Sequence, residues 1–208
     1  MSEEPATVSV GNPGLDVILR GGLPANRLYL CEGMPGSGKT TLALKFLLDG
    51  RDKGEPALYI TLSETSEELS VVAKSHGWDL DGIALFELAS ADEVLGAGRD
   101  QSILHSFEME LGETINLIKA EVERIKPKRV VFDSLSEMRL LAQDPLRYRR
   151  QLLLLKQFFA GLNTTVILVD DLTSYSGERD NHLHSLCHGV ITLERLTLDF
   201  GAARRARR

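Results

Sequence analysis

Short apolar runs alternate with amphipathic stretches along this chain of 208 residues. Nearly continuous apolar runs, bounded by turn-forming residues, are typical of strands that are buried on both faces of a sheet. The runs occupy residues 28–32, 57–62, 83–88, 129–133, 164–169 and 190–193. We expect each of them to form a strand.

Helical segments separate these runs. Residues 40–48 contain no helix breaker, and we expect their helix to end at Gly50 or Gly54. In residues 107–125, apolar side chains recur at alternating steps of four and three, which predicts one buried helix face. That stripe consists of Leu111, Ile115, Ile118, Val122 and Ile125. Pro127 then stops this helix.

Two further patterns predict two more helices. Residues 66–75 form the first, and His76-Gly77 closes it. Its apolar face consists of Leu69, Val72 and Ala73. A second long helix is expected to start near Pro145, because proline suits the first helical position. Its inner face consists of Leu152, Leu155, Phe159 and Leu162.

Strands that alternate with helices imply right-handed crossovers between neighbouring parallel strands. We therefore predict an α/β fold with a mostly parallel sheet and helices on both of its faces. The length is near the upper end of what one hydrophobic core serves, so a single domain is expected over residues 1–208. With 43% hydrophobic and 26% charged residues, the chain has enough apolar material for a sizeable core.

Composition also narrows the class of function. A net charge of -6 and a pI near 5.4 offer no general attraction to a phosphate backbone, so nucleic-acid binding is not expected. The two cysteines, Cys31 and Cys187, lie outside any CxxC pair, as in a reduced cytosolic protein. The acidic start lacks the pattern of a signal peptide, and no apolar stretch is long enough to span a bilayer. We therefore expect a cytoplasmic protein without a membrane segment.

The strongest motif is G-x-x-x-x-G-K-T at residues 33–40, between an expected strand and an expected helix. Its glycines let backbone NH groups approach a polyanion, Lys39 reaches the outer phosphates, and the Thr40 hydroxyl ligates magnesium. The candidate nucleotide-binding residues are Gly33, Met34, Pro35, Gly36, Ser37, Gly38, Lys39, Thr40 and Thr41. ATP with Mg²⁺ is the expected ligand. A glycine-rich turn that binds nothing is the structural alternative.

Asp133 is the candidate magnesium partner of Thr40. A magnesium ion held by a threonine hydroxyl needs a second carboxylate at the end of a neighbouring strand, and Asp133 follows the apolar run Val130-Val131-Phe132. An aspartate in this position can also be only the cap of a following helix.

Several segments around this loop resemble the KaiC-like branch of the RecA/RadA superfamily of ATPases. They are Gly14-Leu15-Asp16, Gly21-Gly22-Leu23-Pro24, Tyr59-Ile60-Thr61-Leu62-Ser63-Glu64-Thr65, Gly77-Trp78-Asp79-Leu80 and Phe132-Asp133-Ser134-Leu135-Ser136. The resemblance extends from about Val10 to Leu196. It implies a RecA-type core, binding of ATP and magnesium, and ring-shaped hexamers with nucleotide between subunits. An oligomeric switch in prokaryotic signalling is the function that it implies.

The chain departs from this family pattern after the second expected strand. KaiC domains carry a Glu-Glu pair there that activates the attacking water, and the alignment places Ser63 at the first position and Glu64 at the second. A serine cannot act as a carboxylate base, so hydrolysis should be slow unless Glu64 or an aspartate such as Asp170 takes this role. Glu64 is therefore the candidate catalytic residue, together with Lys39. The alternative for Glu64 is an acid that only caps the following helix.

A second departure lies at the end of the chain. The family pattern continues into a basic strand whose cations reach the phosphates of the neighbouring subunit, whereas residues 200–208 contain only a cluster of arginines. This shortened end is either the beginning of that strand or, as we favour, a solvated tail.

Other classes of function stay open. Ser63 and the shortened end also fit a non-hydrolysing ATP-binding interaction module. A RadA-like DNA-dependent ATPase would need contacts with DNA, and the acidic composition of this chain gives no indication of them. A small-molecule kinase is the least favoured, because no substrate lid is recognisable.

Two smaller clusters remain. The residues His182, His184, Cys187 and His188 could hold zinc, although no partner cluster is visible elsewhere in the sequence. Asp170-Asp171 follows a strand where RecA-like proteins place a residue that senses the terminal phosphate. A cap of the next turn is the alternative for this pair.

Overall fold

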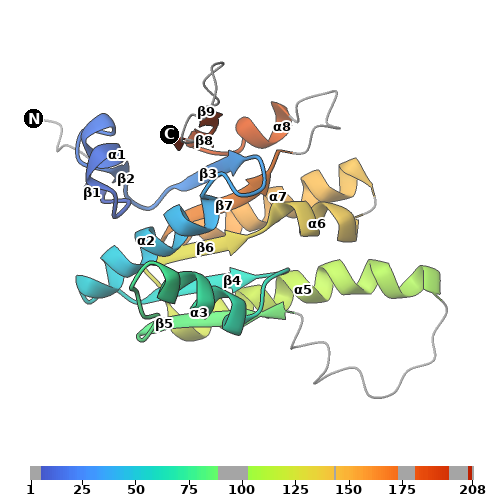
Figure 1. The fold of residues 1–208 in the computed structure, drawn as a ribbon. Helices are drawn as coiled ribbons and strands as arrows, with labels where there is room; N and C mark the ends of the chain where they lie inside the picture. The colour runs from blue at the N-terminus through green and yellow to red at the C-terminus, as the bar shows by residue number, and fades with distance from the viewer. Residues whose placement is uncertain (1–5, 89–102, 143, 173–180, 197–205, 208) are drawn as a thin grey trace, which may run out of the picture.

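The computed structural model describes residues 6–88, 103–142, 144–172, 181–196 and 206–207. Its centre is a six-stranded sheet in the order β5-β4-β6-β7-β3-β8, in which every neighbouring pair is parallel (Figure 1). The strands are β3 Leu28–Gly33, β4 Ala57–Thr61, β5 Ile83–Glu87, β6 Arg129–Asp133, β7 Thr165–Asp171 and β8 Gly189–Leu193. All six predicted strands are confirmed.

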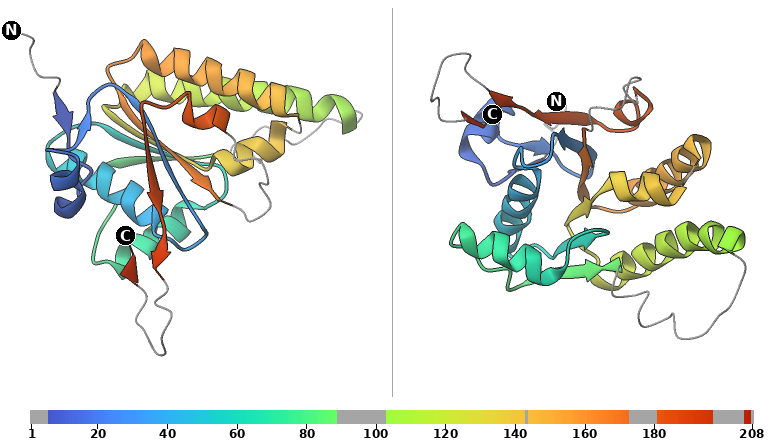
Figure 2. Two further views of the ribbon diagram at one scale, coloured as in Figure 1. Left: turned by 90° about the horizontal axis from the view of Figure 1, so that it is seen from above. Right: turned by 45° about the vertical axis from the view of Figure 1, so that its right-hand side comes forward.

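Helices cover both faces of this sheet, which confirms the predicted α/β architecture. They are α1 Pro13–Ile18, α2 Lys39–Asp52, α3 Ser66–Ser75, α5 Ile103–Ile125, α6 Leu135–Ala142, α7 Pro145–Ala160 and α8 Asn181–His184. The helices α2 and α3 lie on one side of the sheet, and α5, α6 and α7 lie on the other (Figure 2, right). Among the described residues, none of the helices combines the length and apolar character that crossing a bilayer requires.

Two short antiparallel pairs flank the sheet. They are β1 Thr7–Val8 with β2 Leu23–Pro24, and β9 Arg195–Leu196 with β10 Ala206–Arg207. The sequence patterns predicted neither pair, because strands of two residues carry no periodic signal.

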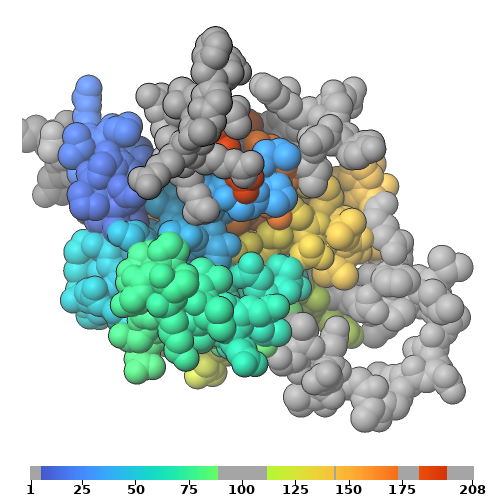
Figure 3. All heavy atoms as spheres, in the orientation of Figure 1, coloured from blue at the N-terminus to red at the C-terminus, as the bar shows by residue number. Residues whose placement is uncertain are grey.

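Side chains alternate along each strand between two apolar cores. In β4, Leu58 and Ile60 join the core beneath α5, α6 and α7, whereas Tyr59 joins the core beneath α2 and α3. Because both faces are covered, both sets must be apolar, which explains the continuous hydrophobic runs. The near face in Figure 3 shows α2 and α3 packed over the sheet.

The predicted helical faces point into these cores. In α5 the stripe residues Ile115, Ile118 and Val122 are buried, and Ile125 packs against the same core; the Leu111 side chain lies outside the described residues. In α7 and α3 the expected inner residues also pack inward. These are Leu152, Leu155 and Phe159 in α7, with Leu162 just beyond the end of that helix, and Leu69, Val72 and Ala73 in α3.

The helix α6 was missed by the sequence reasoning. It begins two residues after Asp133 and buries Leu135, Met138 and Ala142. The spacing of these three residues is helical, but a segment of eight residues holds too few repeats to separate a helix from a loop. The sequence patterns therefore predicted no helix between Asp133 and Pro145.

The end of α2 settles the choice between Gly50 and Gly54. The helix ends at Asp52, with Lys53 as its C-cap, and Gly54 follows with a φ of 75°. Gly50 lies inside the helix because the Arg129 side chain passes so close that a Cβ atom would come within 2.5 Å of its Cδ atom. A close approach from a distant strand, and not a helix end, explains this glycine.

Arg129 is almost fully buried and forms a dense network at the start of β6. Its guanidinium donates to the carbonyl oxygens of Ser9 and Phe46, each at 2.8 Å, and pairs with the carboxylates of Asp49 and Glu55. A buried cation without such partners would be strongly unfavourable. The network therefore ties β6, α2 and the N-terminal segment together.

Replacing Arg129 by Met should lower the free energy of unfolding by about 3 kcal/mol, because two carboxylates and two carbonyl oxygens lose their donor. Asp49 and Glu55 are partly exposed and can regain water, which keeps the loss at the low end of the range for buried pairs. Urea denaturation measures it. The control Arg124→Met removes an exposed pair with Glu121 and should lower the midpoint far less than Arg129→Met does. Equal losses in both variants would contradict the burial argument.

Candidate active site

Candidate residues from four strands meet at one edge of the sheet. The carboxyl ends of parallel strands lie together, and ligands of open α/β sheets bind at that edge. The phosphate loop, residues 33–40, follows β3, the pair Ser63-Glu64 follows β4, and Asp133 ends β6. The sheet register sets Gly33 beside Asp171 and Thr61 beside Asp133.

The phosphate loop leads directly into the first turn of α2. Gly38 is the N-cap with a φ of 105° and provides no side-chain cap for the NH groups of that turn. The first turn of a helix lacks intrahelical acceptors for its NH groups and carries partial positive charge. Within the described residues, the buried Ser37 hydroxyl also has no hydrogen-bond partner. The loop thus offers several donors to an anion and no carboxylate of its own.

Lys39 lies buried beneath this loop with 7% of its surface exposed. Its amino group donates to the carbonyl oxygens of Gly33 at 2.9 Å and Met34 at 3.1 Å, and it pairs with Asp171 Oδ1 at 2.7 Å. An anion that contacts this amino group must compete with the Asp171 carboxylate.

The neighbouring Asp170 and Asp171 point to opposite faces of the sheet. Asp170 accepts hydrogen bonds from Ser136 Oγ and from Arg139 Nη2 of α6, both at 2.8 Å. Burial raises the pKa of Asp170, and the charge of Arg139 opposes this rise. The idea that Asp170 activates water is therefore wrong in this structure, because its carboxylate is engaged on the α6 side. Asp171 is the member of the pair that faces the phosphate loop.

Tyr59 links the two candidate magnesium ligands. Its hydroxyl donates to Asp133 Oδ2, and the Thr40 side chain lies near enough to the same phenol to oppose the rise of its pKa. Burial raises the pKa of Asp133, while the hydrogen bond from Tyr59 opposes this rise. Burial and the adjacent Asp133 charge raise the pKa of Tyr59, so the phenol stays protonated. The sequence reasoning missed Tyr59, since a tyrosine in an apolar run predicts only a core position.

Arg195 is another residue that the sequence reasoning missed. It lies in β9, and its Nη2 atom donates to the carbonyl oxygen of Pro35 in the phosphate loop at 2.9 Å. The guanidinium is exposed and adds positive charge beside the loop. Its distance from Pro35 in sequence, 160 residues, left no local signal for this contact.

Comparison with known proteins shows the family of this chain. The family model of the KaiC ATPases matches residues 8–207. This chain belongs to the KaiC ATPase family. A UPF0273 protein of Pyrococcus furiosus is 33% identical to it, over 92% of this chain and 78% of that protein. A UPF0273 protein of Methanocaldococcus jannaschii is 30% identical, over 92% of this chain and 80% of that protein.

A solved structure shares the fold. The crystal structure of a KaiC-like protein from Pyrococcus horikoshii matches with a TM-score of 0.78 at 25% sequence identity. The match covers 98% of this chain and 86% of that chain. The resemblance inferred from the motifs is thus confirmed at the level of family and fold.

Ser63 and Glu64, where this KaiC-family chain departs from the Glu-Glu pattern, lie in different surroundings. Ser63 is exposed, whereas Glu64 is half-buried, and no described residue donates a hydrogen bond to its buried Oε2 atom. The helix α3 is capped by Thr65, which forms a capping box with Glu68. The alternative that Glu64 only caps this helix is therefore wrong. Its carboxylate is left available for another role.

The C-terminal arginines are not all in a solvated tail. Ala206–Arg207 forms β10 and pairs with β9, which carries Arg195. The alternative of a strand at this end of the chain thus has support at these two residues. Residues 197–205 and 208 lie outside the described residues.

The proposed zinc cluster is not assembled. His184 Nε2 lies 2.9 Å from Glu32 Oε2, whereas His188 Nδ1 lies 3.2 Å from the backbone nitrogen of Leu28. Within the part of the chain that the structure describes, no group of three or more His, Cys, Asp or Glu residues could hold a metal ion. The His182 side chain lies outside that part.

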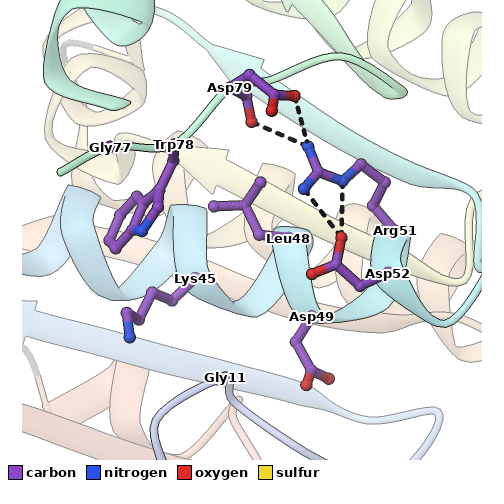
Figure 4. Close-up of a pocket in the computed structure, with 9 residues that line it drawn as sticks. All are labelled: Gly11, Lys45, Leu48, Asp49, Arg51, Asp52, Gly77, Trp78 and Asp79. Carbon is purple, nitrogen blue, oxygen red and sulfur yellow. Dashed lines mark hydrogen bonds and ion pairs between the residues drawn. The ribbon is translucent and has the colours of Figure 1, made fainter. Parts of the chain in front are cut away.

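A surface pocket of about 290 Å³ lies away from the phosphate loop, along the outer side of α2 (Figure 4). Lys45 lies over the Trp78 ring at 5.4 Å, and Arg51 pairs with both Asp52 and Asp79. Arg51 is thus paired within the protein itself.

Glu64→Gln should stabilise the protein in the absence of ligand. Burial, followed by the charges of Asp133, Glu68 and Asp171, raises the pKa of Glu64 above its unfolded value. The ionised side chain therefore lowers stability at pH 8, and this penalty disappears as pH falls through the raised pKa toward ~4. Partial exposure screens the effect, so the melting temperature should rise by about 1–2 °C at pH 8 and not at all at low pH.

A control variant with the opposite expected effect on the melting temperature is available in α5. The hydrogen bond from Arg124 lowers the pKa of Glu121, so Glu121→Gln should lower the melting temperature at pH 8. Thermal melts of both variants across this pH range test the assignment. A Glu64→Gln variant that is less stable than wild type at pH 8 would show that this carboxylate has a stabilising partner.

Proposed function

We propose that this KaiC-family protein binds ATP with magnesium at its phosphate loop and hydrolyses it slowly as an oligomeric switch. The observation that carries the proposal is the set of donors at the loop. The first turn of α2 has no side-chain cap, the Ser37 hydroxyl has no described partner, and the Lys39 amino group is buried beneath the loop. Such an arrangement suits a polyanion and nothing apolar.

The roles of the candidate residues follow from these positions. Backbone NH groups of residues 33–41 would surround the phosphates, and Lys39 would neutralise the outer ones. Thr40 and Asp133 would hold Mg²⁺, and their linkage through Tyr59 supports a shared ligand. Bound magnesium would offset the charge that develops on the transferred phosphoryl group.

Hydrolysis requires a group that orients or activates water. Glu64 is the best candidate, because its carboxylate has an unpartnered buried oxygen, and the charges of Asp133 and Asp171 act on it. Its raised pKa favours proton uptake, as a general base needs. The exposed Ser63 at the other family position favours slow turnover. A non-hydrolysing ATP-binding module is the second candidate, and binding without turnover would establish it.

Assembly into a ring of six subunits is part of the proposal by family resemblance. Arg195 supports it indirectly, because this arginine and the β9–β10 pair stand beside the loop where a second subunit would approach the nucleotide. Mass measurement with and without Mg-ATP distinguishes a nucleotide-dependent assembly from a monomer. The acidic chain gives no support to a nucleic-acid partner.

Lys39→Ala should weaken Mg-ATP binding by about 100-fold, because a buried charge-assisted contact to phosphate is lost. Calorimetry measures binding, and phosphate release by the same samples measures turnover. Lys74→Ala, which removes an exposed lysine of α3, is the matched control and should bind as wild type does. Equal affinities and equal rates of phosphate release in wild type and Lys39→Ala would reject the proposed function.

Asp171→Asn should tighten Mg-ATP binding by about threefold to tenfold, because the phosphate no longer competes with a carboxylate for Lys39. Calorimetry at low ionic strength makes the difference largest. Asp170→Asn is the control, since its carboxylate faces α6, and its affinity should stay within twofold of wild type. Weaker binding by Asp171→Asn would mean that Asp171 assists the ligand and does not compete with it.

A further inference from the structure

Tyr59 occupies a position that neither the phosphate-loop motif nor the family comparison assigns. It lies in the middle of β4, is fully buried, and joins the apolar core beneath α2. Its hydroxyl nevertheless donates to the Asp133 carboxylate of β6, and the Thr40 side chain of α2 lies near the same phenol. A phenol placed only to fill the core would need one partner for its hydroxyl.

The direction of the hydrogen bond from Tyr59 determines how the two candidate ligands could face a metal ion. The single proton of Tyr59 goes to Asp133 Oδ2, so its oxygen can accept the proton of Thr40. A threonine hydroxyl that ligates a cation must direct a lone pair to it and its proton elsewhere. Tyr59 is placed to accept that proton, and its own proton occupies one oxygen of Asp133 while the other stays available.

We propose that Tyr59 is a positioning residue for magnesium, which orients the Thr40 hydroxyl and the Asp133 carboxylate toward one shared cation. The inference rests on the proposed function, since it concerns the magnesium that accompanies ATP. Groups that hold metal ligands in this way set ligand orientation without touching the metal.

The sheet geometry explains why this role falls to residue 59. The register sets Tyr59 beside Val131, and Asp133 lies two residues further along β6 on the same face. On that face, a tyrosine ring is long enough to bring its hydroxyl to the end of the neighbouring strand. Phenylalanine would fill the same volume and leave both ligands without this partner.

The test compares Tyr59→Phe with wild type by calorimetry of ATP binding, once with Mg²⁺ and once with EDTA. We expect about tenfold weaker binding with Mg²⁺, as for the loss of other groups that orient metal ligands, and unchanged binding with EDTA. Tyr29→Phe is the matched control, because it removes a tyrosine hydroxyl that bonds only to the Pro24 carbonyl within the described residues. This control should change neither affinity.

A double-mutant cycle tests whether Tyr59 acts through Thr40. In the Thr40→Ala background, Tyr59→Phe should reduce the Mg²⁺-dependent part of the affinity by less than about threefold, because one of the two groups that it orients is already absent. A full tenfold loss in that background would show that Tyr59 acts elsewhere.

The outcomes separate this inference from the proposed function. Wild-type protein that binds no Mg-ATP would overturn both. If wild-type protein binds Mg-ATP and the Tyr59→Phe variant binds it with the same affinity, the inference alone would be overturned. Equal weakening of Tyr59→Phe with Mg²⁺ and with EDTA would also overturn it, since it would indicate general damage to the nucleotide site.

Discussion

The two-residue alternation of side chains along buried parallel strands is the constraint on which this structure depends. Each strand sends successive side chains into different cores, so one step along the chain moves a group from one face of the sheet to the other. At the carboxyl edge this parity decides which polar groups face α2. It brings Tyr59, Asp133 and Asp171 to the phosphate-loop side, and it sends Glu32 and Asp170 to the side of α6 and α8.

The two ends of the sheet differ in how fully their polar groups are satisfied. At the start of β6, the buried Arg129 is surrounded by two carboxylates and two carbonyl oxygens, so every partner in the network contributes to stability. At the carboxyl edge, Ser37 and Glu64 each carry a buried oxygen atom without a described partner. Unsatisfied buried groups lower stability, and proteins retain them mainly where function requires them. The contrast is a physical reason to place the candidate site at the carboxyl edge.

The same constraint explains where sequence reasoning about the site succeeded and failed. Asp133 ends β6 and Lys39 follows the loop after β3, so their motif spacing placed them at one edge. The error on Asp170 was avoidable in principle. Asp170 lies two residues after the buried Leu168 in β7, so both side chains point to the side of the sheet opposite α2. Asp171 is then the residue that faces the loop. The capping box at Thr65 and Glu68 was likewise readable, and it removes the capping role from Glu64.

The sequence by itself determined the strands, the long helices, the parallel α/β architecture and the phosphate loop, because each depends on local periodicity or on a contiguous motif. Only the tertiary structure decided that Tyr59 joins Thr40 to Asp133, that Arg195 contacts the loop, and that Arg129 fills the space beside Gly50. These contacts unite residues far apart in the chain, and neither hydrophobic pattern nor propensity encodes which distant side chains meet. The packing of the two cores determines which distant side chains meet, because it sets the register of the strands and the distances between the helices and the sheet.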